Sequence, residues 1–262
     1  MDVIGNNPTP LYNGGNTCYV NAALQFLGCV PQLYPLSENV IFQRLYDGKP
    51  VCTREIQALV SDVFPEFAGR SQQDPHEWIL RLLERLSTRG DVLDQPGFQS
   101  ISEISVVHEA CGYHSLHTIA SHPHLLFVGQ GQSVEQALQQ YEMVETVAIS
   151  CGCGDHIQAS RVERIRSPPA GLLVVLDRYS SSVERAAASL QMQWHTTTYT
   201  LCASIQYHRH GTNGGHYTTV TRRDGMSFYN CDDGRITCIT ESQFEAATRL
   251  SYLLLYVAHT CC

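Results

Sequence analysis

The spacing of apolar positions divides the chain into a helical first third and a strand-rich remainder. Apolar residues recur every three to four positions in three segments, which predicts amphipathic helices over Tyr19–Leu27, Ile56–Val63 and Trp78–Leu86. Thr17 or Asn16 can cap the first helix, and Gly28 ends it. The last of the three opens at Asp74-Pro75-His76-Glu77, where an aspartate N-cap, a proline and a glutamate occupy their preferred positions.

After Gly90-Asp91 the pattern changes to short alternating or β-branched segments bounded by turns. These predict strands over Ile101–Val106, Leu125–Val128, Glu145–Ile149, Gln158–Ile165, Leu172–Leu176, Tyr199–Tyr207, Tyr217–Thr221, Met226–Asn230 and Tyr252–Val257. One helix interrupts them, opened by the capping box Ser133–Gln136 and continuing through Tyr141. Helices in the first part of the chain followed by an antiparallel sheet predict an α+β fold with a papain-like division. Pro168-Pro169 marks a join between segments of one domain.

Composition narrows the class of protein. A chain of 262 residues with 43% hydrophobic content can bury a sizeable core. The formal net charge of −8 disfavours nucleic acid and suits either a basic protein partner or simple solubility. No apolar run is long enough to span a membrane, and Met1-Asp2-Val3 does not begin a signal peptide. Eleven cysteines at irregular spacing argue against a disulfide framework, so we expect a cytoplasmic or nuclear protein.

Cys18 is the strongest candidate for chemistry. It stands where the glycine-rich turn Gly14-Gly15-Asn16-Thr17 becomes a helix, so the positive end of the helix dipole would favour its thiolate. Beside an imidazole, such a thiol titrates at about 3.5–7.5. The alternative is a small buried hydrophobic residue, as many free cysteines are.

A base and an acid occur together near the other end of the chain. Asp224-Gly225 between two strand segments predicts a hairpin, and its turn length sets the pairing. A two-residue turn places His216 opposite Asp233, whereas a three-residue loop centred on Asp224 places it opposite Asp232. In either register a carboxylate can orient the imidazole. Taken alone, these residues could also be an exposed histidine and a turn.

Acyl transfer also needs donors for the developing oxyanion. The backbone N–H of Cys18 and the side-chain amide of Asn13 are the candidates. Asn13 could instead be a turn residue that tolerates a left-handed backbone.

These motifs resemble those of the ubiquitin-specific proteases. Leu11–Gln25 is similar to the cysteine box of that family and Gln72–Trp78 to its QQDxxE(F/W) segment. Gly215–Tyr217 with Tyr229–Asp233 resembles its histidine box, and Tyr252–Tyr256 its closing strand. The resemblance implies a papain-like cysteine protease fold, with a helical thumb at 1–90, fingers mainly at 91–166 and a β palm mainly at 167–262.

The resemblance also implies roles for individual residues. Cys18 would be the nucleophile, His216 the base and Asp232 its orienting acid. Asn13 would donate to the oxyanion, with Asp233 as an auxiliary polar group. The implied reaction is hydrolysis after the C-terminal glycine of ubiquitin through a thioester. Another ubiquitin-like modifier as substrate, or a catalytically silent ubiquitin-binding module, are the alternatives.

Four residues would bind the substrate's tail. Asp74 and Glu77 would face basic residues of the ubiquitin tail, although helix capping alone also explains them. Gly215 and Tyr217 flank the histidine. Three features depart from the family pattern and put selectivity in question, namely Phe228 in place of tryptophan, Cys231 in place of phenylalanine, and the short stretch Ser180–Thr198.

A second cluster has the ligands of a structural zinc site. His108-Glu109-Ala110-Cys111 and Cys151-Gly152-Cys153 supply four ligands, as a tetrahedral ion requires. Family fingers often carry two Cys-x-x-Cys pairs, so the histidine and the contracted second pair leave a metal-free remnant as the alternative. His114, His117 and His156 are substitute ligands, and no catalytic cofactor is expected.

Overall fold

The computed structural model describes residues 7–30, 44–45, 48–63, 65, 73–88, 97–121, 123–129, 131–176, 188–210, 214–223 and 226–259. Some positions named above lie outside the described residues: Met1–Val3, Gln72, Gly90-Asp91, residues 180–187, Asp224-Gly225 and the side chains of Val63 and Leu86. The described helices are α1 (Cys18–Leu27), α3 (Thr53–Val63), α4 (Pro75–Thr88), α5 (Val134–Tyr141) and α6 (Glu241–Thr248), with a 3-10 turn η3 (Glu109–Cys111).

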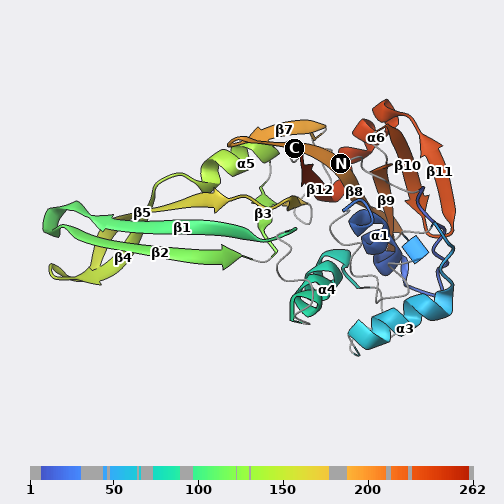
Figure 1. Cartoon of the computed structure of the whole chain (residues 1–262), viewed down its shortest axis with the longest axis horizontal. Coiled ribbons are helices and arrows are strands. Elements are labelled where there is room, and N and C mark those ends of the chain that lie inside the picture. The colour runs from blue at the N-terminus through green and yellow to red at the C-terminus, as the bar shows by residue number, and fades with distance from the viewer. Residues whose placement is uncertain are drawn as a thin grey trace.

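Four strands form a small antiparallel sheet that projects from the body of the molecule as a long arm (Figure 1). Its order is β2-β1-β5-β4, made of β2 (Tyr113–Ser121), β1 (Ser100–His108), β5 (Gly154–Ser167) and β4 (Glu145–Cys151). His108 pairs with Tyr113 at the end of the β1–β2 ladder, and Cys151 with Gly154 at the end of the β4–β5 ladder. The two hairpin turns therefore come together at the tip of the arm.

A second sheet of eight strands forms the other part of the molecule. Its order is β11-β10-β9-β8-β12-β6-β3, with β7 paired to β8 off that path. The strands are β3 (Leu125–Val128), β6 (Gly171–Leu176), β7 (Gln191–Trp194), β8 (Thr197–His210), β9 (Gly214–Arg223), β10 (Ser227–Asp232), β11 (Arg235–Ile239) and β12 (Ser251–Ala258). All its pairs are antiparallel except β3 with β6. The structure thus shows the predicted α+β fold, with one parallel pair that the sequence did not indicate.

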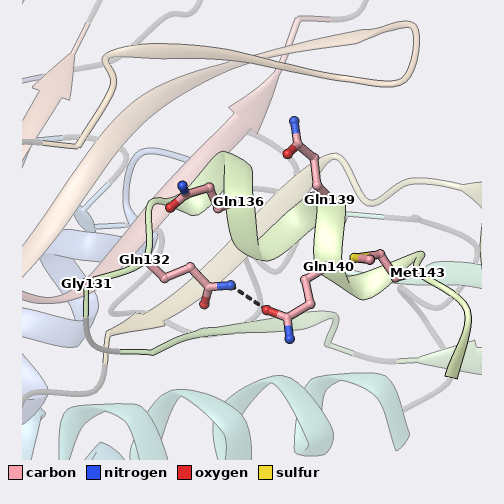
Figure 2. Close-up of a pocket in the computed structure, with 6 residues that line it drawn as sticks. All are labelled: Gly131, Gln132, Gln136, Gln139, Gln140 and Met143. Carbon is pink, nitrogen blue, oxygen red and sulfur yellow. Dashed lines mark hydrogen bonds between the residues drawn. The ribbon is translucent and has the colours of Figure 1, made fainter. Parts of the chain in front are cut away.

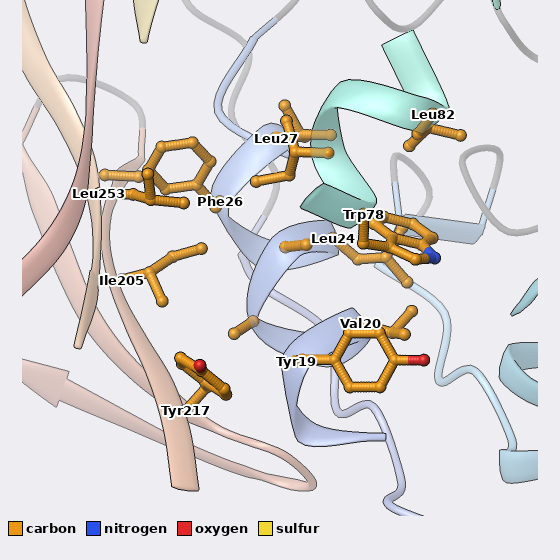
Figure 3. Close-up of a cluster of buried hydrophobic side chains, with 14 of the residues drawn as sticks. Tyr19, Val20, Leu24, Phe26, Leu27, Trp78, Leu82, Ile205, Tyr217 and Leu253 are labelled. Carbon is orange, nitrogen blue, oxygen red and sulfur yellow. The ribbon is translucent and has the colours of Figure 1, made fainter. Parts of the chain in front are cut away.

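The large sheet is covered on both faces. Along β12, Leu253 and Leu255 belong to a core shared with α1, α3 and α4, whereas Leu254 and Tyr256 belong to a second core shared with α5 and α6. This alternation follows from the two-residue period of a strand. All ten residues of α1 are buried, and Figure 3 shows this helix between α4 on one side and the strands on the other.

The arm joins the large sheet through a polar network beside α5. The Tyr141 hydroxyl donates to Glu163 on β5 at 2.6 Å, and Arg161 binds the same carboxylate at 2.7 Å. The backbone N–H of Ile165 donates to Glu142 at 3.0 Å. These hydrogen bonds to charged groups fix α5 on the base of the arm, where Glu163 is 8% exposed.

The predicted elements are largely present, and their ends differ by a few residues. The capping box at Ser133 is confirmed, with the Ser133 hydroxyl accepting from the N–H of Gln136 and the reciprocal bond also formed. Thr17 does occupy the N-cap of α1, but its side chain makes no capping bond, and Asn16 has a left-handed φ of 57°. Strands β2, β7 and β11 and helix α6 were not predicted. Among the described residues, no helix is both long and apolar enough to cross a bilayer.

Candidate active site

The start of α1 lies beside the start of β9. Thr219 on β9 donates to the carbonyl of Ala22 at 2.8 Å, and Arg223 at the end of β9 donates to the carbonyl of Gln25 at 3.1 Å. Later strand residues therefore contact later helix residues, so the helix and the strand run in the same direction. Figure 3 shows Tyr217 next to the end of α1 that carries Tyr19. This alignment brings the Cys18 end of the helix to the His216 end of the strand.

Cys18 is the first residue of α1 and is 4% exposed. The N–H groups of the first helical turn have no acceptor within the helix, so this position favours a negative charge on sulfur. Burial raises the pKa of the neighbouring Tyr19 to about 12, and the charge of Cys18 adds to that rise. A thiolate at this place would thus leave the tyrosine neutral.

His216 has its predicted acidic partner. Its Nε2 lies 2.6 Å from Oδ1 of Asp232, and both side chains are partly buried. Because Nε2 faces the carboxylate, Nδ1 is the nitrogen that remains to accept a proton from a thiol. Asp232 can hold the ring in one orientation and stabilise its cationic form.

The strand register that creates this contact differs from both predicted ones. Tyr229 pairs with Thr221, and Ser227 pairs with Arg223. These pairs shift the register by one residue from the one that a two-residue turn would give. The β9–β10 ladder ends at the pair of Cys231 with Thr219, so neither aspartate lies directly opposite His216 in it. Both register predictions are wrong. The carboxylate still meets the imidazole because Asp232 follows the last ladder pair and its side chain reaches across.

Asp233 points to a different set of partners. Its Oδ2 accepts from the amide of Asn13 at 2.9 Å, and its Oδ1 accepts from the amide of Asn21 at 2.7 Å. Its backbone carbonyl accepts from the N–H of Leu11 at 3.2 Å, and its φ of 50° is left-handed. Consecutive aspartates thus serve different groups, one the imidazole and the other the segment that leads into α1.

Asn13 organises the turn before Cys18. Its Oδ1 accepts from the N–H groups of Gly15 and Thr17 at 2.9 and 3.2 Å, and from the Thr17 hydroxyl at 3.0 Å. Its amide nitrogen carries two protons, and Asp233 accepts one of them. The other proton is the one that an oxyanion could accept.

Asn21 is a site residue that the sequence analysis missed. Its side chain is 2% exposed and donates both to Asp233 and to the carbonyl of Leu11, the latter at 3.0 Å. The available signal was a polar amide three residues after Cys18, within a helix whose other polar side chain is Gln25. Such a residue inside a buried helix needs partners, and here they are the two segments that flank the site.

The predicted tail-binding carboxylates have different surroundings. Asp74 accepts the N–H of His76 at 2.8 Å, as an N-cap does, and both of its oxygens accept from the Tyr252 hydroxyl at 3.0 and 2.8 Å. Glu77 lies one position further into α4 than His76 and is exposed. Asp74 therefore links the helix to β12, and Glu77 is the carboxylate that faces solvent.

Gly215 and Tyr217 lie next to His216 along β9 in a tight aromatic setting. The ring of Tyr207 fills the place where a Cβ on Gly215 would stand, with ring atoms 2.1 Å from that position. Tyr207 and Tyr217 have ring centroids 5.0 Å apart. Only glycine fits at position 215 with this ring in place.

The two residues that depart from the family pattern are both buried. Phe228 packs on Phe244 with ring centroids 5.1 Å apart, and Cys231 is 2% exposed. Burial raises the pKa of the Cys231 thiol to about 12, which makes this cysteine an inert core residue.

At the tip of the arm the four predicted metal ligands meet. Nδ1 of His108 lies 3.2 Å from the sulfur of Cys111 and 3.7 Å from that of Cys151, and these two sulfurs are 3.6 Å apart. One ligand atom from each of these residues and Cys153 lies within 4.8 Å of the others. Tetrahedral zinc with Zn–S of about 2.3 Å and Zn–N of about 2.0 Å separates its ligand atoms by about 3.5–3.8 Å. The cluster therefore has the dimensions of a metal site.

Hydrogen bonding polarises the thiols of this cluster. The hydrogen bond from His108 lowers the pKa of Cys111 to about 7, and the hydrogen bond with Cys111 raises the pKa of Cys153 to about 11. The substitute ligands His114, His117 and His156 are not among the clustered groups of the described residues. The predicted four ligands thus come together without them.

A depression of about 620 Å³ on α5 is separate from these sites (Figure 2). Glutamines line most of it, and Gln132 donates to Gln140 at 2.7 Å across one side. Its walls are Gly131, Gln132, Gln136, Gln139, Gln140 and Met143. No candidate catalytic residue lines it, so it is not the place of the proposed chemistry.

Comparison with known proteins gives a family match over almost the whole chain. The family model described as ubiquitin carboxyl-terminal hydrolase matches residues 9–256. The mouse ubiquitin carboxyl-terminal hydrolase 17-like protein B is 25% identical over 299 residues, covering 94% of this chain and 63% of its own length. The human ubiquitin carboxyl-terminal hydrolase 17-like protein 5 is 25% identical over 302 residues, covering 94% and 55%. The chain thus spans between about half and two thirds of these relatives.

Solved structures share the fold. The SAGA DUB module of Ubp8, Sgf11, Sus1 and Sgf73 bound to monoubiquitin gives a TM-score of 0.78 at 17% identity, covering 99% of this chain and 71% of the matched chain. The same module bound to ubiquitin aldehyde gives a TM-score of 0.71 at 17% identity over the same shares. The papain-like arrangement of thumb, palm and fingers is therefore present.

Proposed function

Because this chain belongs to the ubiquitin carboxyl-terminal hydrolase family, we propose that it is a cysteine-type deubiquitinase that hydrolyses the bond after the C-terminal glycine of ubiquitin. The observation that carries the proposal is the contact of His216 with Asp232 at 2.6 Å, at the end of β9 that lies beside Cys18. The two solved structures of similar fold contain ubiquitin or ubiquitin aldehyde, which supports ubiquitin as the partner.

Each residue of the site has a role in this reaction. His216 takes the thiol proton of Cys18 through Nδ1, and the thiolate attacks the carbonyl carbon of the terminal glycine. The tetrahedral intermediate collapses to a thioester as the imidazolium gives its proton to the leaving lysine amine. Water activated by His216 then hydrolyses the thioester and regenerates the thiol.

The oxyanion of each tetrahedral intermediate needs preorganised donors. The backbone N–H of Cys18 and the second amide proton of Asn13 supply them. Asp233 holds Asn13 from the other side at 2.9 Å, which gives this aspartate its auxiliary role.

Substrate selection falls to groups around the passage to Cys18. Glu77 is exposed on α4 and can attract a basic residue of the ubiquitin tail, while Asp74 holds Tyr252 in place. Gly215, which is covered by the ring of Tyr207, and the buried Tyr217 flank His216 and support the strand that carries it. This arrangement favours a tail that carries arginine over the tail of another ubiquitin-like modifier.

A ubiquitin with a C-terminal electrophile tests the assignment. We expect the chain to form a covalent adduct that is absent in Cys18→Ala and slowed in Asp232→Asn. Binding of ubiquitin without an adduct would instead support a catalytically silent binding module. Faster capture of a probe built on another ubiquitin-like modifier would indicate that this modifier, and not ubiquitin, is the substrate.

For the cluster at the arm's tip we propose a structural zinc ion held by His108, Cys111, Cys151 and Cys153. Its support is the match between the ligand separations and tetrahedral coordination. Zinc would link the two hairpin turns and take no part in the hydrolysis. Metal analysis of purified protein is expected to give one zinc per chain, reduced in Cys151→Ser.

We also propose a cytoplasmic or nuclear location. None of the nine cysteines among the described residues forms a disulfide, which suits a reducing compartment. Imaging of the tagged protein would test it.

A further inference from the structure

A buried arginine holds the far end of the helix that carries Cys18. Arg223 is 6% exposed and lies at the end of β9. Its Nη1 donates to the carbonyl of Gly28, and its Nη2 donates to the carbonyl of Gln25 at 3.1 Å. The carbonyls in the last turn of a helix accept no hydrogen bond from the helix itself, so they need donors from elsewhere. Arg223 supplies them from the strand.

Gly28 makes room for this contact. A Cβ on Gly28 would lie 2.8 Å from Nη2 and 3.1 Å from Nη1 of Arg223. The φ of Gly28 is −63°, which any residue can adopt, so backbone conformation does not require glycine here. The absence of a side chain is what lets the guanidinium cover the helix end.

The charge of Arg223 is compensated by the helix. None of the ion pairs between described residues includes Arg223, and its Nε has no hydrogen-bond partner among them. The negative pole of α1 and its carbonyls face the guanidinium. Burying a cation without a carboxylate partner is costly, so Arg223 depends on its hydrogen bonds to the helix carbonyls.

The position of this contact matters because α1 and β9 carry the two reacting groups. Cys18 is at one end of α1 and His216 is near one end of β9, while Arg223 joins their opposite ends. Sliding or tilting of the helix along the strand would separate sulfur from imidazole. Thr219 fixes the middle through the Ala22 carbonyl, and Arg223 holds the far end together with the Cys29 thiol, which bonds the Thr221 hydroxyl at 3.0 Å.

We propose that Arg223 is a positioning residue that sets the helix α1 against strand β9 and thereby places the Cys18 sulfur relative to His216. The inference rests on the proposed function. A displacement of the Cys18 sulfur by a few tenths of an ångström would lower the rate of the chemical step and leave the affinity for ubiquitin unchanged.

The test compares Arg223→Met with Arg222→Met. Arg222 is the adjacent arginine, whose guanidinium lies 5.5 Å from the ring of Phe228 on the other face of the strand, so the control loses the same charge. Steady-state cleavage of a ubiquitin fluorogenic ester or amide gives kcat and KM. The pH dependence of Cys18 alkylation, followed on its peptide by mass spectrometry, reports the thiolate without any substrate.

We expect kcat of Arg223→Met to fall by about tenfold or more with KM nearly unchanged. The alkylation midpoint of Cys18 is expected to move up toward about 8.5, the value of an unassisted thiol. Arg222→Met should behave as the parent in both assays. Arg223→Lys, which keeps the charge and a donor, should restore part of kcat.

Gly28→Ala pushes the guanidinium away without removing a polar group, so it should give a smaller change of the same kind. A folded Arg223→Met with parental kcat and alkylation profile overturns the proposal. So does loss of folding in both Arg223→Met and Gly28→Ala, because the arginine would then serve the fold and not the position. An inactive parent with a low alkylation midpoint would refute the proposed function but leave the positioning role measurable.

Discussion

Replacing Asp233 by asparagine tests whether this residue acts through Asn13. The carboxylate accepts from Asn13 with one oxygen and from Asn21 with the other. An asparagine of the same shape has a single acceptor, so its amide group would meet one of the two donors and that hydrogen bond would be lost. The substitution therefore removes one contact and keeps the volume.

The size of the effect follows from the type of contact. A hydrogen bond to a charged group contributes about 1.5–3 kcal/mol. If Asn13 loses its acceptor, the hydrogen bond that orients the oxyanion donor is lost. A loss of about 2 kcal/mol in stabilisation of the transition state corresponds to about a 30-fold fall in kcat. If Asn21 loses it instead, the same energy is withdrawn from stability, and Tm falls by about 4–8 °C.

The bonding pattern favours the loss at Asn13. Asn21 is 2% exposed and has a second acceptor in Leu11, so its position is fixed by the helix and the leading segment. Asn13 is exposed, and water can replace its contact with Asp233. We therefore expect Asp233→Asn to lower kcat with little change in KM and a small change in Tm.

A double-mutant cycle with Asn13→Ala makes the prediction decisive. If Asp233 acts by orienting Asn13, the double variant should be no slower than Asn13→Ala alone. Assays of ubiquitin cleavage for the four proteins at one pH give the coupling. Additive losses, or a normal kcat in Asp233→Asn beside a slow Asn13→Ala, would refute the reasoning.

Three further perturbations follow from the contacts. Tyr252→Phe removes the donor to both oxygens of Asp74, so the free energy of unfolding should fall by about 1.5–3 kcal/mol in urea titrations; an unchanged midpoint would contradict the link between α4 and β12. Removal of zinc by a chelator should lower Tm of the parent but not of Cys111→Ser, and equal shifts in both would count against the proposed site. Burial lowers the pKa of His124 below its usual value of about 6.5, so the unfolded chain takes up this proton first and stability should fall as pH decreases below about 6.5. In His124→Asn the Tm measured between about pH 7.5 and pH 5.5 should depend less on pH than in the parent, and identical profiles would exclude His124 as the cause.

Local patterns in the sequence predicted most of the elements. The capping box at Ser133 and the proline at position 75 mark helix starts that the structure shows. Two of the missed strands, β7 and β11, do alternate polar and apolar residues, but over four and five residues only, which is too short for the pattern to stand out. β2 is largely exposed over its nine residues, and β11 has only five. Their pairing depends on neighbouring strands, which a local pattern does not contain.

The hairpin at Asp224-Gly225 shows the limit of a turn signal. The dipeptide correctly indicated two adjacent antiparallel strands, but the ladder pairs Ser227 with Arg223 and so excludes both predicted registers. A shift of one residue moves every side chain to the other face of a strand. Thr219 donates to the Ala22 carbonyl of α1, and its ladder partner Cys231 is buried, so the register depends on packing between distant segments.

The contact of His216 with Asp232 was predictable because both residues lie in short motifs, and Cys18 stays the predicted nucleophile on the same ground. A cysteine after a glycine turn and a histidine followed by two aspartates carry their own signal. Asn21 and Arg223 have no comparable signal, since an amide in a helix and an arginine near a turn are common on protein surfaces. Their importance comes from burial, and burial is set by the whole fold.

Helix α1 illustrates why both kinds of residue are needed. A helix with all ten residues buried cannot be oriented by amphipathicity, because every side of it contacts protein. Directional hydrogen bonds therefore fix the rotation of the helix and its position along its own axis. They are made by Asn21, Gln25 and Arg223. Apolar packing alone would tolerate small shifts of this helix, and a thiol that must meet an imidazole would not. The polar groups around α1 are thus best understood as the part of the fold that serves the chemistry.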